Sequence, residues 1–535
     1  MISNELAQAG LSVVLFERGK QYTPLDFKHS ELNCQCDSDW PLAYGPSADE
    51  NPRTFRYTDR DEARIVYPGV DDNYGRTAAA VGGATIAYGA ASWRLMPEDF
   101  RMKSTYGTVP GASLEDWPVS YADLEPFYEK AEYELGVSGL AGADPFAAPR
   151  KKPYPVPPLP LNRQGELLTT AGRRLGWHPF PPPFAILSKP YRGRSACIRC
   201  NWCLGQICEA GAKSSTQIAV IPRALQTGNC QLRSRCFVTR ILTDANGLAT
   251  GVEYFNAEGR RQEQPADLVI VACSATETPR LLLNSAGRLH PRGLGNSSDQ
   301  VGRNLMGHIY AGGFGVFEEK IVHQEGPGPS IAFNDWNHPR SREIIGGGYI
   351  YNFHTTHPID FASIRPPGEP LWGKAHKEFQ RKWFHRFIWL DSNCQDMPRE
   401  RNRVDLDPRV RDAWRMPVAR ITHSFMHRDY HEAEWVMDKE EALLNEAGAI
   451  RTWRARNRRG GVGEHQLGTC RMGNDPKTSV VNRFCQSHEV DNLFITDGSC
   501  FVTSAGFNPA LTIQTLSLWA ADYIKRQWKG GAWRH

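Results

Sequence analysis

The sequence lacks a long apolar stretch and a charge excess of either sign. No apolar run approaches the roughly 18 to 20 residues of a membrane-spanning helix, and the longest, at 268–273, has the length of a buried strand. The 63 lysines and arginines exceed the 59 aspartates and glutamates by only four, so the composition does not indicate binding to nucleic acid or to a membrane surface. We therefore expect a soluble protein without a transmembrane segment and without a nucleic-acid partner.

We also expect no secretory leader, because no basic segment followed by an apolar stretch and a small-residue cleavage site opens the sequence. Two locations stay open: the cytoplasm, or export and peripheral attachment through a partner subunit. The 535 residues exceed one ordinary core and predict about two or three domains.

The first twenty or so residues have the pattern of the second half of a dinucleotide-binding unit. Residues 2–9 indicate the end of a helix that Gly10 closes, and residues 11–16 indicate a buried strand that ends in Glu17. An acid at this strand end accepts hydrogen bonds from adenosine ribose hydroxyls. The expected glycine-rich turn is absent, so we predict an apolar strand and a Gly-x-Gly-x-x-Gly turn encoded upstream of Met1.

Other segments give local predictions. The proline-rich stretch 145–183 is expected to be an extended connector. Residues 237–255 indicate a strand pair that turns at 244–247, and residues 268–273 indicate a further apolar strand.

Roughly eighty C-terminal residues carry three motifs in succession. They are HQLGTCRMG beginning at His465, NLFITDGS beginning at Asn492, and GFNPALT beginning at Gly506. The second has the pattern of a buried strand that ends in Asp-Gly, and the third opens a helix.

With these motifs the sequence resembles the glucose-methanol-choline (GMC) oxidoreductases, flavoproteins that oxidise alcohols with FAD, and most closely their gluconate and sugar dehydrogenase branch. The motifs follow the family order over roughly 500 residues. Besides the C-terminal ones they are Glu17-Arg18-Gly19, Val81-Gly82-Gly83, Asp116-Trp117-Pro118 with Tyr121 to Gly139, Val238, Glu277 to Leu283, and Val301 to Met306 before His308.

The resemblance implies that His465 is the catalytic histidine and that Asn508 is its partner at the flavin face. A neutral imidazole, with an ordinary pKa of about 6.5, can accept the hydroxyl proton while the alcohol carbon gives a hydride to flavin N5. Asn508 would donate a hydrogen bond to the developing alkoxide. Two alternatives stay open: His465 as a structural core residue, and Asn508 as the N-cap of a helix that starts at Pro509.

The same resemblance implies a set of FAD-binding residues. They are Glu17, Arg18, Gly82, Gly83, Thr85, Val238, Asp497, Gly498, Asn508, Pro509 and Thr512. Glu17 would bind the ribose, the paired glycines would form a turn against the flavin, and Asp497 would flank the pyrophosphate. The simpler alternatives are a solvated strand end at Glu17, an ordinary glycine loop, and at Val238 a strand residue without a backbone contact to adenine.

We therefore predict an α/β fold. A Rossmann-like FAD-binding domain, without its first strand and glycine loop, is assembled from residues 1–105, 190–310 and 461–535. Residues 106–189 are connector and cap segments. Residues 311–460, rich in aromatics and arginines and without a phosphate-binding motif, form a second, α+β substrate-binding domain.

Four of the 13 cysteines lie within twelve residues, in the spacing C-x2-C-x2-C-x4-C. They are Cys197, Cys200, Cys203 and Cys208. Ferredoxin-type clusters use C-x2-C-x2-C-x3-C followed by proline, so this spacing is longer and lacks the proline. Three states stay open: an iron–sulfur cluster, a disulfide or structural metal site, and free thiols. The other nine are scattered, which argues against the disulfide framework of a small secreted protein.

The expected function is FAD-dependent oxidation of an alcohol, either a sugar, a sugar acid or a related polyol, with His465 as general base. A small subunit and a cytochrome electron acceptor are the expected partners. The motifs specify the reaction but neither the substrate pocket nor the choice between oxygen and a cytochrome. The alternative is a non-catalytic or electron-transfer subunit with a cysteine-bound iron–sulfur centre and poor FAD binding.

Overall fold

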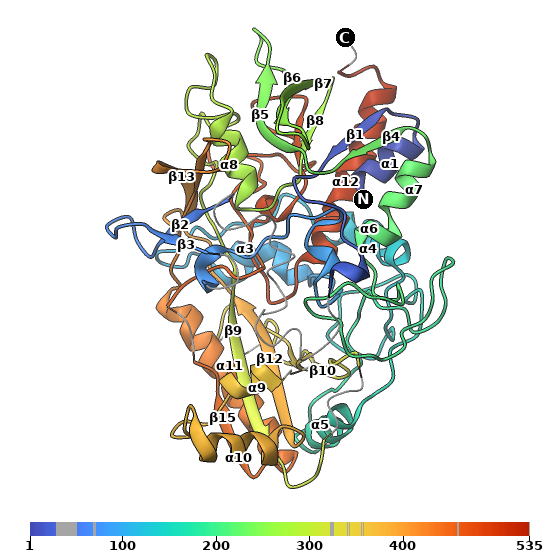
Figure 1. Ribbon diagram of the computed structural model, residues 1–535, viewed down its shortest axis with the longest axis vertical. Coiled ribbons are helices and arrows are strands. Elements are labelled where there is room, and N and C mark those ends of the chain that lie inside the picture. Colours follow the sequence, from blue (N-terminus) through green and yellow to red (C-terminus); the bar gives the residue numbers. More distant parts are fainter. Residues whose placement is uncertain are drawn as a thin grey trace.

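The protein has two regions stacked along its long axis in the computed structural model (Figure 1). The structure describes residues 1–27, 51–67, 71–321, 326–339, 341, 343–354, 356, 358–456 and 459–533. The region at the top of Figure 1 contains short parallel strand pairs among helices, and the region at the bottom contains a long antiparallel sheet. This combination confirms the predicted α/β fold with a second, α+β part.

Two parallel strand pairs form the centre of the upper region. The pairs are β1 (Val13–Phe16) with β4 (Cys230–Arg233), and β8 (Val269–Val271) with β16 (Leu493–Ile495). Helices α1 (Ile2–Gln8), α7 (Ile221–Gln226) and α12 (Ala510–Lys529) lie beside them. Strands β1, β8 and β16 consist of valine, isoleucine, leucine and phenylalanine, as is typical of parallel strands that are covered on both faces. Strand β4 is more polar, with the sequence Cys-Gln-Leu-Arg.

The N-terminal helix and strand confirm the local prediction. The φ angle of Gly10 is 85°, and its N–H donates to the Ala7 carbonyl at 3.1 Å. Strand β1 starts two residues later than predicted. The reason is that the Leu11 N–H still donates back to the Leu6 carbonyl at 3.1 Å, so this residue belongs to the closing turn of the helix.

An antiparallel three-stranded sheet lies next to these pairs, formed by β5 (Phe237–Thr243), β6 (Ala249–Phe255) and β7 (Arg261–Pro265). The β5–β6 pairing confirms the predicted strand pair, and β8 confirms the predicted apolar strand.

A five-stranded antiparallel sheet dominates the lower region. Its order is β10 (Ala332–Phe333), β11 (Ile350–Asn352), β12 (Phe387–Gln395), β9 (His308–Val316) and β15 (Arg451–Arg454). Helix α11 (His427–Glu446) packs against one face. A Cβ on Gly313 would lie 2.8 Å from the Cβ of Glu440, so glycine in β9 allows the helix to approach this closely.

The remaining helices connect and cover these sheets. They are α3 (Met102–Tyr106), α4 (Tyr121–Leu135), α5 (Arg163–Arg174), α6 (Thr216–Ala219), α8 (Glu277–Asn284), α9 (Pro358–Ser363) and α10 (Gly373–Trp383). Within the described ranges, none of the helices has both the length and the apolar character needed to cross a membrane.

Helix α5 lies inside the proline-rich stretch that we predicted to be extended. Its twelve residues contain no proline, and the Asn162 side chain caps the helix by accepting a hydrogen bond from the Gly165 N–H at 2.9 Å. The helix packs against α11. The prolines therefore delimit a helix, and the prediction of an extended connector was wrong over this segment.

A mixed sheet joins distant parts of the chain. Its strands, in order, are β13 (Arg403–Arg411), β14 (Pro417–Thr422), β2 (Arg53–Arg56) and β3 (Arg64–Val66). Strand β14 runs parallel to β2, with Thr422 opposite Arg56. The domain boundaries stay a prediction, and this sheet contains strands from both predicted domains.

Candidate active site

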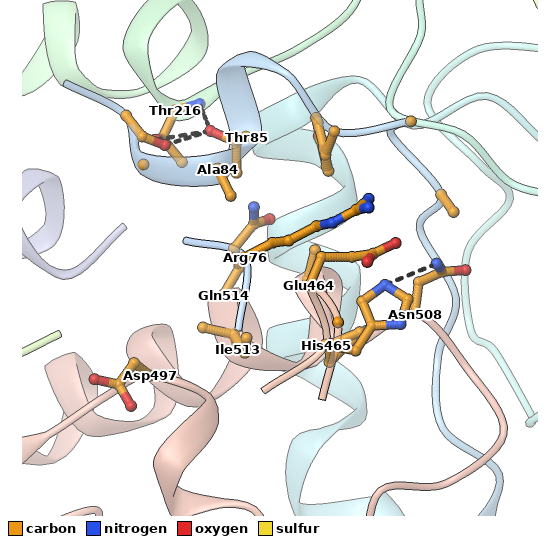
Figure 2. A pocket seen from close by; sticks show the side chains of 18 of the residues that line it. Arg76, Ala84, Thr85, Thr216, Glu464, His465, Asp497, Asn508, Ile513 and Gln514 are labelled. Atoms are coloured by element: carbon orange, nitrogen blue, oxygen red, sulfur yellow. Dashed lines mark hydrogen bonds between the residues drawn. The ribbon is translucent and has the colours of Figure 1, made fainter. Parts of the chain in front are cut away.

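A cavity of about 1350 Å³ is lined by residues of both regions. One end is bounded by β1, β8 and the start of α12, and the other by cavity-facing residues of β9, β11 and β12. Figure 2 shows the part between them, where the side chains of Arg76, Glu464, His465 and Asn508 lie close together. The cavity therefore brings the N-terminal and C-terminal motifs to one place.

Glu17 lies directly after β1 and lines the cavity. Its Oε1 atom accepts a hydrogen bond from the Gly19 N–H at 2.7 Å. A Cβ on Gly19 would lie 1.8 Å from the Ala79 carbonyl oxygen, so only glycine fits at this turn. Burial raises the pKa of Glu17 to about 7, because the carboxylate has lost water. Hydroxyl donors from a ligand would stabilise it.

The paired glycines form a tight turn beside the cavity. Gly82 and Gly83 have φ angles of 94° and 58°, which favour glycine. The Gly82 carbonyl accepts hydrogen bonds from the Thr85 hydroxyl at 2.6 Å and from the Thr216 hydroxyl at 3.0 Å. The Thr216 N–H also donates to the Thr85 hydroxyl oxygen at 3.0 Å (Figure 2). Thr85 was predicted from the sequence, but Thr216 was not, because it follows the cysteine cluster and belongs to no motif.

Asp497 ties the strand end of β16 to the start of α8. Its Oδ2 atom accepts hydrogen bonds from the Ser274 N–H at 3.1 Å and from the Thr278 hydroxyl, and Oδ1 accepts from the Ser499 N–H at 2.8 Å. The carboxylate thereby links the junction between β8 and α8 to the 3-10 helix at Gly498–Cys500.

Eight of the predicted FAD-binding residues line the cavity: Glu17, Gly82, Gly83, Thr85, Val238, Asp497, Asn508 and Pro509. Three others do not. The Arg18 guanidinium lies 5.7 Å from the ring centroid of Phe237, and Gly498 begins a 3-10 helix. The Thr512 hydroxyl lies 2.7 Å from the Tyr128 hydroxyl, in the core between α12 and α4.

His465 lies in the middle of the cavity and is held from both sides of its ring. Its Nε2 atom lies 3.2 Å from Asn508 Nδ2 (Figure 2). Its Nδ1 atom lies 2.8 Å from His308 Nδ1 and 3.1 Å from the Tyr310 hydroxyl. Burial lowers the pKa of His465 to about 3, so the imidazole is neutral at ordinary pH.

The partners of His308 determine which nitrogen of His465 carries the proton. His308 Nε2 lies 2.9 Å from the Ala505 carbonyl oxygen, which can only accept, so the His308 proton is on Nε2. Burial lowers the pKa of His308 to about 3, so its Nδ1 is unprotonated and accepts from His465 Nδ1–H. The His465 lone pair is therefore on Nε2, which faces Asn508.

Asn508 is oriented by a second chain of polar groups. The Tyr349 hydroxyl donates to Asn508 Oδ1, and Asn393 Nδ2 donates to the Tyr349 hydroxyl at 3.1 Å. This fixes the Asn508 amide with Nδ2 toward His465. The Asn508 side chain does not cap α12. This helix starts at Ala510, its N-cap residue is Pro509, and it has no side-chain cap hydrogen bond.

The four clustered cysteines do not converge on one point. All four are free thiols, with Cys200 exposed and Cys203 buried. In the part of the chain that the structure describes, no three His, Cys, Asp or Glu side chains are placed to hold a metal ion. The predicted metal ligands Cys197, Cys200, Cys203 and Cys208 are thus not supported as an iron–sulfur or structural metal site.

A buried lysine holds the cysteine segment instead. The Lys213 ammonium donates to the Gln206 carbonyl at 2.6 Å, to the Tyr88 carbonyl at 3.0 Å and to the Cys203 carbonyl. Burial lowers the pKa of Lys213 to about 8. An internal cation that binds carbonyl groups orders this segment without metal ligands. No role for this lysine was predicted from the sequence.

Sequence models of the GMC oxidoreductases match residues 74–310 and 398–517, which together contain the glycine turn, His308, His465 and Asn508. The chain belongs to the GMC oxidoreductase family. The predicted family is confirmed, and so is its class as an oxidoreductase.

Curated GMC relatives extend over nearly the whole chain. The 2-methyl-1,2-propanediol dehydrogenase of Mycolicibacterium austroafricanum is 32% identical over 98% of this chain and 93% of its own length. The fructose dehydrogenase large subunit of Gluconobacter japonicus is 29% identical over 99% of this chain and 96% of its own. The second relative agrees with the predicted sugar dehydrogenase branch.

Solved GMC structures share the fold. The pyridoxine 4-oxidase from Mesorbium loti superposes with a TM-score of 0.66 at 16% identity, covering 100% of this chain and 97% of that one. At this identity the likeness shows the architecture alone.

FAD is the cofactor of the family, and the cavity residues fit it. Glu17 presents an acceptor for hydroxyl groups, and the Gly82 turn leaves a flat ligand room to approach. Two cavity-lining polar atoms, Gln514 Oε1 and Thr496 Oγ1, are buried and have no hydrogen-bond partner among the described residues. A ligand with polar edges as well as flat rings would satisfy them.

The residues missed by the sequence analysis come mainly from the antiparallel sheet. Tyr310 lies on β9, Asn393 lies on β12 and Tyr349 directly precedes β11. They contact the predicted catalytic pair directly or through one group. Each lies in a short segment in which apolar and polar residues alternate, a pattern that is typical of any β-strand. Glu464 precedes His465 and could have been found from its place beside the motif.

Proposed function

We propose that this GMC oxidoreductase oxidises an alcohol CH–OH group to a carbonyl with bound FAD, and that His465 Nε2 accepts the hydroxyl proton. The observation that carries the proposal is the hydrogen-bond chain from the Ala505 carbonyl through His308 to His465. Bound FAD would supply the acceptor for the hydride that leaves the same carbon.

The geometry supports a separate role for each of His465, Asn508 and Tyr349. His465 offers a lone pair whose position is set by His308, so a hydroxyl bound against Nε2 meets a base without a tautomer change. Asn508 Nδ2 lies 3.2 Å from the same atom and can donate to the oxygen as negative charge develops there. Tyr349 keeps that amide from rotating.

The names of the two relatives support a polyol or sugar as the substrate. One is named for a diol and the other for fructose, and both align along nearly the whole chain. We propose that residues 311–460 provide the substrate side of the cavity, together with the neighbouring Tyr310. Because the fructose relative is named a large subunit, we include a small subunit as a partner. The cytochrome acceptor stays an expectation from the sequence.

Anaerobic flavin reduction tests the proposal directly. FAD-loaded protein mixed with 2-methyl-1,2-propanediol or D-fructose should lose its oxidised-flavin absorbance. The His465→Ala variant should keep its flavin but react roughly 10² to 10⁴ times more slowly, since a positioned general base contributes on that order. A variant that reacts at the wild-type rate would refute the role of His465.

A further inference from the structure

One wall of the cavity combines an aromatic platform with amide and carboxyl groups. Alternate residues of a strand point to one face of a sheet, and on β12 this places Trp389, Asp391 and Asn393 toward the cavity. On β11 and directly after it, Tyr351 and Phe353 line the same wall. These are the residue types that bind sugar rings: flat apolar surfaces for C–H groups and oxygen acceptors for hydroxyls.

The platform is formed by two stacked rings. The centroids of Phe353 and Trp389 lie 3.7 Å apart with an interplanar angle of 22°. The Trp389 Nε1 atom and the Asn393 Oδ1 atom are buried and have no partner among the described residues, although both side chains line the cavity. Buried polar atoms of this kind are normally satisfied, so a donor and an acceptor are available to a polar ligand.

Asp391 provides the charge of this wall. The residue is 7% exposed, and its Oδ2 atom accepts a hydrogen bond from the Tyr351 hydroxyl at 3.1 Å. No lysine or arginine in the described ranges forms an ion pair with it. Burial raises the pKa of Asp391 to about 7.

Arg76 and Arg456 line the same cavity, but neither of these arginines shifts the pKa of Asp391. The titratable groups that act on it or feel its charge are Tyr310 on β9, Tyr349 just before β11, Tyr351 on β11, Cys394 on β12, Glu440 on α11, and Glu464. All of them are neutral or acidic. An ionised Asp391 is thus an uncompensated buried anion.

The position of Asp391 relative to His465 follows from strand register. Asn393 pairs with Tyr310, and the Tyr310 hydroxyl lies 3.1 Å from His465. Asp391 is two residues further along β12, which is roughly 7 Å. The carboxyl group therefore faces a part of the substrate several carbons away from the reacting one.

We propose that Asp391 is a specificity-determining residue that selects uncharged polyhydroxylated substrates and rejects sugar acids. The inference rests on the proposed alcohol oxidation and narrows its substrate class. A neutral sugar lying on the Phe353 and Trp389 rings donates two hydrogen bonds from its hydroxyl groups to the carboxylate. A substrate carboxylate at this place meets a like charge in a buried site, and such juxtapositions are strongly unfavourable.

The test compares D-fructose with D-gluconate as reductants of the FAD-loaded protein under anaerobic conditions. The wild type should show a half-saturating gluconate concentration at least about tenfold above that for fructose, and this ratio should grow as pH rises through 7. The Asp391→Asn variant should bring the two values together and remove the pH dependence. Its isosteric amide still accepts hydroxyl donors.

Glu440→Gln is the matched control. This glutamate is buried under the same sheet, and burial raises its pKa to about 8, but it bonds Ser392 and does not line the cavity. It should leave the ratio unchanged. If Asp391→Asn fails to fold, the pH dependence of the wild-type ratio still decides the matter.

Three results would overturn the inference: equal wild-type values for the two sugars, an unchanged ratio in Asp391→Asn, or reduction by 2-methyl-1,2-propanediol but by neither sugar. In each of these the proposed alcohol oxidation stands. Absence of flavin reduction by all three compounds would instead refute the proposed function itself.

Discussion

The Nδ1 atom of His308 lies 2.8 Å from the Nδ1 atom of His465, and only one of these two nitrogens can carry the shared proton. His308 carries its proton on Nε2 and donates it in a hydrogen bond to the Ala505 carbonyl. The proton between the two rings is therefore on His465 Nδ1. Ala505 itself has a φ angle of 55°, an unusual conformation for alanine that turns its carbonyl toward His308. A backbone feature thus determines the tautomer of the proposed base.

Replacing His308 tests this arrangement. In His308→Leu the acceptor for His465 Nδ1–H is lost, so the other tautomer of His465 becomes accessible. We expect the rate of flavin reduction to fall roughly ten- to a hundredfold, with little change in the half-saturating substrate concentration. His308→Asn keeps an acceptor for His465 and a donor for the carbonyl, so it should retain most of the rate. Stopped-flow absorbance measures both. Equal losses in the two variants would show a packing role only.

Asn508→Ala removes the proposed alkoxide donor and should cost about 10² to 10³-fold in the rate of flavin reduction. Tyr349→Phe removes only the hydroxyl that orients the amide, so its loss should be about tenfold. Thermal melting is the control for both. A change in melting temperature without a change in rate would assign Asn508 a structural role.

The stability of the FAD-free protein should depend on Glu17. Its pKa is raised to about 7 in the folded state from an ordinary 4.5, so the folded state holds the proton more tightly. Stability is then lost as pH rises from 4.5 to 7, and the loss is complete above 7. Glu17→Gln should therefore be more stable than the wild type at pH 8, by on the order of 3 kcal/mol, and similar to it at pH 4.

Urea unfolding at the two pH values measures this difference, with the exposed Glu258→Gln variant as control. Glu17→Gln should also bind FAD more weakly, because an amide oxygen is a poorer acceptor for ribose hydroxyls than a carboxylate. A wild-type pH profile in the Glu17 variant would contradict the assignment.

Lys213 should matter more to the cysteine segment than any thiol does. Lys213→Met leaves three carbonyl acceptors without their donor and should lower the free energy of unfolding by about 2 to 5 kcal/mol. Replacing the exposed Lys189 by Met is the control, and replacing the exposed Cys200 by serine should have little effect.

Metal analysis completes this test. Protein purified without oxygen should contain no stoichiometric iron or acid-labile sulfide. Several iron atoms per chain with a paramagnetic signal in one redox state would restore the iron–sulfur hypothesis for the four cysteines.

Contiguous motifs were enough to predict two residues that the structure brings together in the cavity. His465 and Asn508 were predicted because each lies in a run of neighbouring residues whose order is typical of the family, and their side chains lie 3.2 Å apart. Their catalytic roles stay a prediction. Their supporting groups could not be found this way. Asn393 reaches Tyr349, and Tyr349 reaches Asn508, only because β11 and β12 pair across the sheet. Such pairings carry little signal in a short apolar alternation.

The error in the connector has a similar physical basis. Proline frequency over a long window predicted an extended chain, but the helix α5 needs only twelve consecutive proline-free residues and the Asn162 cap.

The cysteine spacing was also ambiguous in sequence, because the positions of the thiols alone do not say whether a nearby cation is a metal ion or a lysine. Lys213 lies only five residues after the cluster.

The sheet in which β2 pairs with β14 also constrains how the protein folds during its synthesis on the ribosome. Arg56 bonds Thr422 across the two strands, 366 residues later in the chain. At about 5 to 20 residues per second, the earlier strand emerges roughly 20 to 70 seconds before its neighbour exists. During that interval its edge is exposed to other chains. Efficient production of this enzyme should therefore depend on chaperones that shield nascent chains, and slowing translation should increase that dependence.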